Sequence, residues 1–383
     1  MYLHSLYLQD FRNYREQRVT FEAPKTIIVG PNAQGKSNLL EAVELLATLR
    51  SHRVSRDRDL VRQQAQTARI EAQIQRSYGD LDAALILRTQ GRRTAWRNQE
   101  TLRRQLDFLG TLNAVQFSCT DLELVRGGPE TRRHWLDALV MQLEPVYAHI
   151  LSQYNKVLKQ RNALLRKLKR GEMQRRETAP QLAVWDAQLV AHGTRVTRRR
   201  ARVLRRLAPI AQTWQQRISG AAETLTTAYQ PHVVWREDEV QAVQQLFLQQ
   251  LQQRAIAEQH QGRTLVGPHR DEIAFQLNDV PARTYASQGQ QRTLVLALKL
   301  AELELIEQVV GDAPLLLLDD VLAELDLQRQ HQLLETIQAR CQTLITTTHL
   351  QTFASDWLHS AQVLAIQDGQ VSPANFLANT ITR

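Results

Sequence analysis

Apolar and polar residues alternate along the first part of the chain. Residues 2 to 8 follow a period of two, which predicts a strand with one buried face, and residues 18 to 29 end in a β-branched run typical of a buried strand. Shortly afterwards Leu39, Leu40 and Val43 recur at helical spacing. The N-terminal region is therefore expected to form strand, tight loop and helix in that order.

The pattern changes further along. Two alternating runs, from Ala68 and from Leu81, predict antiparallel strands joined by a turn at residues 78–80. Between Pro129 and about His260 the chain reads as helical and contains few strand formers. This stretch predicts an inserted helical domain.

Strand patterns return after Thr264. The run IAFQLNDVP contains a turn signal at Asn278 and Asp279, and a helix is expected from Gln288. The apolar run PLLLLDD, a helix over 326–339 and the strand TLITTTH follow.

The domain organisation follows from this order. The length of 383 residues suits two or three domains. Alternating β and α elements at both ends predict one α/β domain, built from residues 1–128 and 263–383, with a mainly helical lobe at 129–262 inserted between them.

Charge adds a partner class to this picture. Lys and Arg number 48 against 39 Asp and Glu, which gives a net charge of +9 and favours a polyanionic partner such as nucleic acid. The excess is concentrated in residues 151–206, which contain 16 basic and three acidic residues. This window is either a solvated helix surface or a DNA contact. The DNA-binding candidates are Arg161, Lys167, Arg170, Arg198, Arg199 and Arg200.

The cysteine count and the apolar runs indicate the cellular compartment of the protein. Cys119 and Cys341 are the only cysteines, so a disulfide framework and a cysteine zinc site are not expected. The N-terminus lacks the pattern of a secretory signal, and no apolar run is long enough to span a membrane. We expect a cytoplasmic protein with no membrane partner.

Residues 30–37 match the P-loop pattern G-x-x-x-x-G-K-[ST]. The glycines allow backbone N–H groups to converge on phosphate oxygens, Lys36 reaches the β and γ phosphates, and the Ser37 hydroxyl ligates Mg²⁺. A plain glycine turn is the alternative, but the strand before the loop and the helix after it favour a nucleotide site. The expected ATP-binding residues are Gly30, Pro31, Asn32, Ala33, Gln34, Gly35, Lys36, Ser37 and Asn38.

A second motif lies at the end of the apolar run Leu315–Leu318. Asp319 is expected to be the Walker B ligand of Mg²⁺, and Asp320 to act as the general base that activates water. Strands often end in turn-forming aspartates, so this signal depends on the P-loop for its meaning.

Tyr285 to Arg292 precede a helix, and the N-terminal N–H groups of a helix attract anions. Ser287 could be an ordinary capping residue. The segment also resembles the signature of ABC-type ATPases, which implies that Ser287, Gly289 and Gln290 contact ATP held by the P-loop of a second subunit.

Two weaker motifs complete the order seen in such ATPases. Residues 323–326 resemble a D-loop, with Glu324 and Asp326 as its acidic members, and His349 occupies the switch-histidine position after the strand LITTT. With Lys36 and Asp320, His349 makes up the expected catalytic set.

Several further motifs resemble the RecF family of bacterial DNA replication and repair proteins, and the resemblance covers essentially the whole chain. They are LxLxxFRNY at 6–14, GPNAQGKSNLLEA, Ser51-His52-Arg53, Gly127-Gly128-Pro129, Arg132-Arg133, Leu136-Asp137, Gly267-Pro268-His269-Arg270-Asp271 and ASQGQQRT. The chain departs from the family at Ala323, where Ser is usual, and at 119–121, where a Pro-acidic pair is usual.

Spacing alone does not assign a role to every motif. Ser51–Arg53 and Gly267–Asp271 either bear on DNA or brace the interface between domains. Arg132 and Arg133 either pair with acidic neighbours or touch DNA phosphate. Gln116 is a candidate for the Q-loop glutamine.

The resemblance implies an ABC-type ATPase head, with a P-loop α/β core and an antiparallel β subdomain, plus the helical lobe. It further implies an ATP-dependent homodimer that clamps DNA, at duplexes and single-strand/duplex junctions, and promotes loading of RecA at gaps and stalled forks with RecR as partner. Slow hydrolysis would reset the clamp. A transporter subunit, an SMC protein with a long coiled coil and a metabolic kinase fit the sequence less well.

Overall fold

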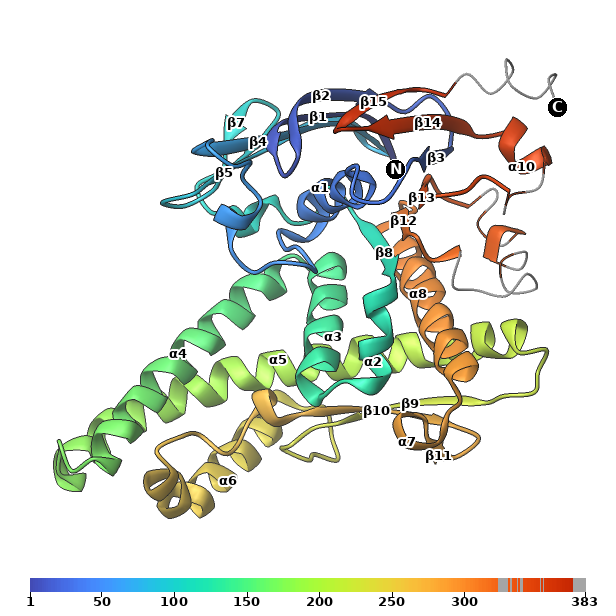
Figure 1. The fold of residues 1–383 in the computed structure, drawn as a ribbon. Coiled ribbons are helices and arrows are strands. Elements are labelled where there is room, and N and C mark those ends of the chain that lie inside the picture. Colours follow the sequence, from blue (N-terminus) through green and yellow to red (C-terminus); the bar gives the residue numbers. More distant parts are fainter. Residues whose placement is uncertain are drawn as a thin grey trace, which may run out of the picture. The chain divides into compact units, whose positions relative to one another are not determined.

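The computed structural model describes residues 1–322, 330, 333–335, 337, 340–351, 353 and 355–374, with the backbone alone at 175–177 and 356. The chain divides into two compact units. Unit 1 comprises Met1–Asp121 and the chain from Val295, and unit 2 comprises Leu122–Leu294. Figure 1 shows the elements of both.

Unit 1 contains a six-stranded antiparallel sheet, sheet A, with the order β2-β1-β4-β5-β6-β7. Its strands are β1 (Tyr2–Phe11), β2 (Tyr14–Thr20), β4 (Thr67–Arg76), β5 (Gly79–Arg88), β6 (Thr94–Arg97) and β7 (Glu100–Thr101). The predicted hairpin is confirmed, because β4 and β5 pair antiparallel up to Arg76 and Gly79.

Unit 1 also contains the sheet that carries the P-loop, sheet B, with the order β15-β14-β3-β13-β12-β8. Its strands are β3 (Lys25–Val29), β8 (Ala114–Ser118), β12 (Leu315–Asp319), β13 (Thr343–Thr347), β14 (Gln362–Gln367) and β15 (Gln370–Pro373). Neighbours from β8 to β14 pair in parallel, so their carboxyl ends meet at one edge, where α/β folds bind ligands.

The strand expected over residues 18–29 is in fact two strands. β2 ends at Thr20 in sheet A, and β3 begins at Lys25 in sheet B. The chain passes between the sheets at residues 21–24, where Pro24 has no N–H to donate to a ladder.

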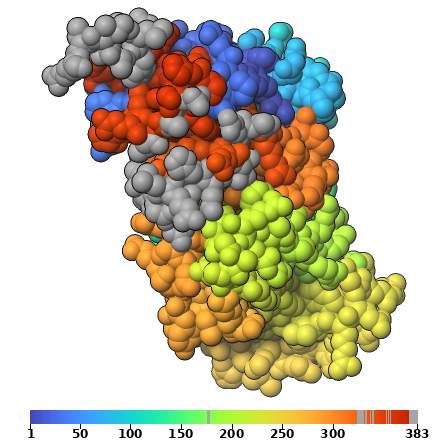
Figure 2. All heavy atoms as spheres, turned by 90° about the vertical axis from the view of Figure 1, so that its right-hand side faces the viewer, coloured from blue at the N-terminus to red at the C-terminus, as the bar shows by residue number. Residues whose placement is uncertain are grey.

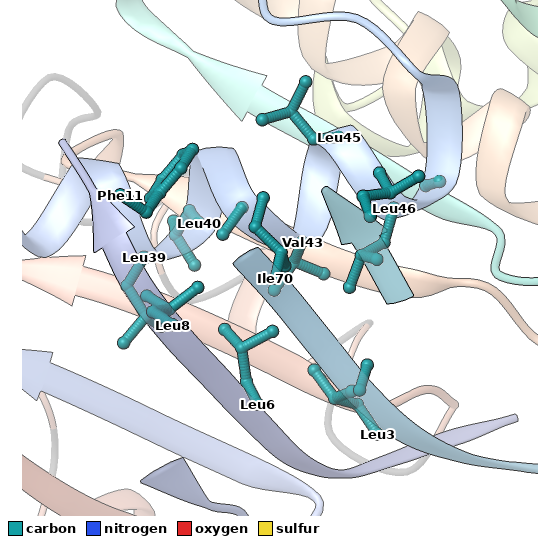
Figure 3. Close-up of a cluster of buried hydrophobic side chains, with 14 of the residues drawn as sticks. Leu3, Leu6, Leu8, Phe11, Leu39, Leu40, Val43, Leu45, Leu46 and Ile70 are labelled. Carbon is teal, nitrogen blue, oxygen red and sulfur yellow. The ribbon is translucent and has the colours of Figure 1, made fainter. Parts of the chain in front are cut away.

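Helix α1 (Lys36–Thr48) packs against both sheets. Figure 3 shows Leu39 and Val43 of the helix close to Leu6 and Leu8 of β1 and Ile70 of β4. All five side chains are fully buried, and burial of each contributes about 1.5–3 kcal/mol. The helix that begins inside the P-loop is thus fixed by the hydrophobic core.

The smaller elements of unit 1 connect these layers. They are the 3₁₀ turns η1 (Asp57–Asp59), η2 (Gln105–Phe108) and η3 (Cys119–Leu122) and the short helix α10 (Ser355–His359). The helix expected over 326–339 falls largely outside the described residues.

Unit 2 is mainly helical. Its helices are α2 (Glu123–Arg126), α3 (Pro129–Leu143), α4 (Val146–Lys169), α5 (Arg175–Ile218), α6 (Val240–Gln261) and α7 (Ala282–Tyr285), with the turn η4 (Pro268–Arg270). α4 and α5 form a long antiparallel pair in Figure 1. In Figure 2 the end of α5, in yellow-green, and α6, in yellow, lie at the surface. No helix in the described part of the chain has the length and apolar character needed to cross a membrane.

Unit 2 also holds a small antiparallel sheet that the sequence reading partly missed. Its order is β11-β10-β9, with β9 (Leu225–Gln230), β10 (Glu272–Leu277) and β11 (Val280–Pro281). Asn278 and Asp279 form the predicted turn, and both have a positive φ.

The expected boundary at residue 262 differs from the structure. Residues 263–294 belong to unit 2, because β10 pairs with β9 along its whole length. The division falls inside α8 (Gln288–Val310).

Candidate nucleotide-binding site

The P-loop lies between β3 and α1 at the carboxyl edge of sheet B. Gly35 has a φ of 117°, which a side chain would strain, and a Cβ at this position would lie 2.7 Å from the Asn13 amide nitrogen. A Cβ at Gly30 would lie 2.4 Å from the carbonyl oxygen of Ile366. Both glycines are therefore required by the shape of the loop.

Lys36 is almost fully buried beneath the loop. Its Nζ donates hydrogen bonds to the carbonyl oxygens of Gly30, at 2.8 Å, and Pro31, at 3.0 Å. The ammonium group therefore sits inside the concave loop, where a P-loop lysine reaches phosphate.

Ser37 and Asp319 meet directly although they are far apart in the sequence. The Ser37 hydroxyl donates to Asp319 Oδ1 at 2.7 Å, and the Thr346 hydroxyl donates to the same oxygen at 2.8 Å. β12 and β13 pair in parallel at this point, which places Thr346 opposite Asp319. The structure thus joins the two residues expected to ligate Mg²⁺, and it adds Thr346, which the sequence reading missed.

Asp320 follows directly with a φ of 54°, in the left-handed region. Its N–H donates to Thr346 Oγ1 at 3.0 Å, so one threonine holds both aspartates. Burial raises the pKa of Asp320, the nearby charge of Lys36 opposes this shift, and the charge of Asp319 adds to it. A carboxylate with a raised pKa accepts a proton more readily, which suits a general base.

Two residues of the FRNY segment, residues 11–14, donate hydrogen bonds to carbonyl oxygens of the P-loop. The Tyr14 hydroxyl donates to the Gly35 carbonyl oxygen at 2.8 Å, and the Asn13 amide donates to the Gln34 carbonyl oxygen at 2.8 Å. Burial raises the pKa of Tyr14 above its usual value, so it remains a neutral donor. The segment was noticed only as a family motif, and the structure shows it as a brace for the P-loop.

Glu41 connects three segments around α1. Its carboxylate is fully buried and accepts two hydrogen bonds from the Arg12 guanidinium, at 2.9 and 2.7 Å, and one from the Ser51 hydroxyl at 2.5 Å. Arg53 lies 3.6 Å away and also donates to the Asn38 side chain at 2.7 Å. Ser51–Arg53 therefore braces α1 within unit 1, rather than an interface between domains.

His52 is held one turn further along α1. Its Nδ1 lies 2.7 Å from Glu44 Oε2. With its amide turned so that the nitrogen faces this carboxylate, Gln116 lies 3.1 Å from Glu44 and 3.2 Å from His52. Burial lowers the pKa of His52, but the charges of Glu44, Glu41 and Asp319 raise it above its usual value overall. Gln116, the Q-loop candidate, thus contacts α1 through Glu44.

The other predicted residues of the head are placed as follows. His349 is exposed and follows β13, and its N–H donates to Thr347 Oγ1 at 3.2 Å. The D-loop residues Glu324 and Asp326, and the departure at Ala323, lie outside the described residues.

The signature segment belongs to unit 2 and forms a capping box at the start of α8. The Gln290 N–H donates to Ser287 Oγ at 3.2 Å, and the Ser287 N–H donates to Gln290 Oε1 at 2.8 Å. Arg126 donates to Gln291 Oε1 at 2.7 Å and holds the next residue. Ser287 is exposed at a rigid helix N-terminus, where anions are attracted.

The Gly267–Asp271 motif lies in a buried network of unit 2. Arg200 donates to both oxygens of Asp137, at 2.8 and 2.9 Å, and to the Pro268 carbonyl oxygen at 2.7 Å. Asp271 accepts hydrogen bonds from the Tyr229 hydroxyl and from the His232 N–H. The motif braces helices and strands inside unit 2, where the sequence reading had left DNA contact open.

Two of the DNA-binding candidates are wrong. Arg161 is 2 % exposed and is hydrogen-bonded to Asp186, Glu258 and Thr264, and Arg200 is 3 % exposed in the network just described. Neither guanidinium reaches the surface, so neither contacts a phosphate.

The remaining candidates are at the surface. Arg198 and Arg199 form ion pairs with Asp238 and Glu144, whereas Lys167 and Arg170 are exposed. Arg132 likewise pairs with an acidic neighbour, Glu272, at 2.8 Å. Position in the basic window therefore does not decide which cations are accessible.

Comparisons with known sequences agree with these motifs. The family model described as the RecF/RecN/SMC N terminal domain matches residues 2–371. The protein named DNA replication and repair protein RecF from Gloeothece citriformis is 63% identical over 381 residues, covering 97% of this chain and 99% of its own length. The protein of the same name from Synechocystis is 61% identical over 375 residues, covering 97% of this chain and 98% of its own length.

Solved structures show the same similarity. A structure of the recombination mediator protein RecF with ATP in the RecFOR pathway matches with a TM-score of 0.89 and 32% identity, covering 97% of both chains. The Smc head domain with an extended coiled coil from Pyrococcus furiosus, bound to the C-terminal domain of ScpA, matches at 0.54 and 15% identity, covering 97% of this chain and 96% of its own length. The second match indicates the fold alone.

Proposed function

The chain belongs to the RecF family of DNA replication and repair proteins, and on this premise we propose that it is an ATP-dependent DNA-binding protein of recombinational repair and replication. The observation that carries the proposal is the hydrogen bond between Ser37 and Asp319, because it joins the P-loop to the Walker B strand in one site. The matching RecF structure was solved with ATP, which supports ATP as the nucleotide.

The residues present fit a magnesium nucleotide. Ser37 and Asp319 supply two adjacent oxygen donors, the type that Mg²⁺ prefers, and residues 31–33 of the loop are exposed at the helix N-terminus, where phosphate binds. Mg²⁺ bound there neutralises charge on the phosphate oxygens. Lys36, beneath the loop, positions the β and γ phosphates.

Hydrolysis in this proposal is slow and serves as a reset. Asp320 takes a proton from the attacking water, since its raised pKa makes it a better base than an ordinary aspartate. His349, after β13, completes the catalytic set, and DNA stimulates the reaction.

The active form is a homodimer closed by ATP. Ser287 caps α8 at an exposed position, where its hydroxyl can still donate a hydrogen bond and the helix N-terminus attracts an anion. Each nucleotide is contacted by the P-loop of one subunit and by Ser287, Gly289 and Gln290 of the other. ATP thus acts as the switch that closes two subunits on DNA.

The partners follow from the family. The dimer binds DNA at duplexes and single-strand/duplex junctions, and it promotes RecA loading at gaps and stalled forks together with RecR. The protein acts in the cytoplasm, and Lys167, Arg170, Arg198 and Arg199 remain candidates for DNA contact.

The test measures molecular mass and DNA binding with and without ATP. Wild type is compared with Lys36→Arg, Ser287→Arg and Asp320→Asn. We expect wild type to dimerise with ATP and Lys36→Arg to bind or hydrolyse ATP poorly. Ser287→Arg should bind ATP but stay monomeric, whereas Asp320→Asn should accumulate as a dimer because it closes but cannot reset. A monomer that ATP leaves unchanged in every case would rule out the clamp.

A further inference from the structure

Helix α4 has a buried apolar face and an exposed basic face. Its buried side chains include Tyr154, Val157, Leu164 and Leu165. The exposed basic residues are Lys156, Lys159, Arg166, Lys167, Lys169 and Arg170, the last directly after the helix. At about 100° per residue, five of them, all but Lys169, fall within roughly 100° of one another around the helix axis. We refer to these five residues as the α4 basic face.

Among the described side chains, acidic residues compensate the α4 basic face only at its end, at Arg170. α4 contains no Asp or Glu from Val146 to Lys169. Two acidic side chains of the same unit, Asp186 and Glu258, are held by the buried Arg161. Glu172 lies 3.4 Å from Arg170, but this pair is well exposed and contributes little.

Like charges three or four residues apart on a helix repel each other, by about 0.2–0.5 kcal/mol per pair. Lys156 and Lys159 are such a pair, and so are Arg166 and Arg170. The face therefore carries an electrostatic cost in the free protein that a bound polyanion removes.

Helix α5 offers a comparison within the same unit. It also carries exposed arginines, among them Arg195, Arg202, Arg205 and Arg206, with Arg217 near its end. Two arginines between them are paired with acidic side chains, Arg198 with Asp238 at 2.5 Å and Arg199 with Glu144 at 3.0 Å. On α5 these two surface arginines are thus held in close ion pairs, whereas on the α4 basic face Arg170 alone has an acidic partner among the described side chains, at 3.4 Å.

We propose that the α4 basic face binds the phosphate backbone of DNA. The proposal rests on the proposed function and assigns its DNA contact to one surface. From residue 156 to residue 170 the face extends about 21 Å along the helix, which matches about six phosphates of one DNA strand at 3.4 Å each. A row of cations whose one described acidic neighbour is the exposed Glu172 complements a polyanionic backbone, and it carries no preference for base sequence.

The test compares two variants of equal charge change. Variant one carries Lys159→Gln, Arg166→Gln, Lys167→Gln and Arg170→Gln on α4, and variant two carries Arg195→Gln, Arg202→Gln, Arg205→Gln and Arg206→Gln on α5. DNA affinity is measured with ATP at several salt concentrations. The plot of log K against log salt has a negative slope, and we expect the first variant to reduce the magnitude of this slope by about 3 to 4 for each protomer in contact. The slope measured for the second variant should differ from the wild-type slope by less than about one.

The possible outcomes distinguish a wrong assignment of the DNA-binding surface from a wrong proposed function. If the α4 variant keeps the wild-type slope, or if the α5 variant lowers it equally, the assignment to α4 is wrong while the proposed function stands. If wild type closes with ATP but binds no DNA, the proposed function fails and the assignment with it. Loss of binding to anionic vesicles, with unchanged DNA binding, would assign the face to a membrane surface and overturn the proposal.

Folding of the variants is checked by dimerisation with ATP, which should match wild type, and by thermal unfolding, in which the α4 variant should be at least as stable as wild type because its like-charge repulsion is relieved. Lys159→Gln and Lys167→Gln alone provide a milder form of the test. Each should lower the slope by about 0.9 per contacting protomer, and unchanged slopes in both would contradict the proposal.

Discussion

The candidate nucleotide site of unit 1 and the charged centre of unit 2 both combine a basic side chain with aspartates, but they differ in exposure. In unit 1, Ser37 and Asp319 meet at the edge of sheet B, beside a loop whose residues 31–33 are exposed. In unit 2, Arg200 is enclosed by Asp137 and by the Pro268 carbonyl oxygen. The difference teaches that burial and local backbone shape, rather than residue type, separate a binding site from a brace.

The same contrast exists within α4. Arg161 faces the core and is satisfied by acidic side chains, whereas Lys167 faces outward without a nearby acid on its helix. Both residues belong to the basic window of the sequence. Their roles can be separated experimentally.

The largest expected effect comes from removing a buried cation. Arg161→Gln and Arg200→Gln each leave buried carboxylates without their partner, which costs about 3–5 kcal/mol. Lys167→Gln should change stability by less than about 0.5 kcal/mol and should affect DNA binding instead. Urea unfolding measures the first effect and salt-dependent DNA binding the second. If Arg161→Gln and Lys167→Gln were equally stable, Arg161 would have no greater structural role than the surface residue Lys167, and the prediction would be wrong.

A second prediction concerns acid and the brace of unit 2. The Tyr154 hydroxyl lies 2.6 Å from His269 Nδ1, and the other ring nitrogen lies 3.2 Å from the Thr264 carbonyl oxygen. Burial is the main cause that lowers the pKa of His269, to about 4. The ring is therefore neutral when folded, while in the unfolded chain it takes up a proton below about pH 6.5.

Stability should consequently fall as the pH is lowered from about 6.5 to about 4, by up to about 3 kcal/mol from this group. His269→Gln should flatten that part of the stability curve. The exposed His260→Gln is the matched control and should leave the curve unchanged. A wild-type curve that the His269 substitution does not flatten would show that this histidine titrates normally.

The third prediction concerns the brace of the P-loop. Glu41→Gln removes the charge that Arg12 and Ser51 bind, and should cost about 2 kcal/mol. It should also weaken ATP binding, because Glu41 lies one turn after Ser37 on α1. Glu44→Gln is the control. Burial raises the pKa of Glu44, so loss of its charge should cost less. Urea unfolding with and without ATP compares them, and an equal cost for both would contradict the special role of Glu41.

The arrangement of the candidate nucleotide site could be predicted because its sequence motifs are local. The P-loop is one continuous segment, and the Walker B aspartates directly follow an apolar strand, so sequence order places them at the same edge of a parallel sheet. Thr346 could not be assigned, since its contact with Asp319 depends on the register between β12 and β13.

The failures in unit 2 have a different cause. Arg161 and Arg200 are buried by residues far along the chain, such as Glu258 and Pro268. The domain boundary was misplaced for the same reason, because β10 pairs with β9, a strand from a distant part of the sequence. Helical periodicity was available in the sequence, and it places Arg161 on the same face as Val157 and Leu164.

The last prediction distinguishes two roles of Ser287, the capping of α8 and contact with the nucleotide of a second subunit. Ser287→Ala removes the side-chain acceptor of the Gln290 N–H and should cost about 1 kcal/mol. Ser287→Asp retains a good cap, so its stability should match wild type, but its negative charge would lie against the phosphate in the proposed dimer. We therefore expect Ser287→Asp to fold normally and remain monomeric with ATP, as measured by light scattering. If Ser287→Asp dimerises like wild type, Ser287 only caps the helix. Its role would then be structural, as the role of the buried Arg200 in unit 2 is.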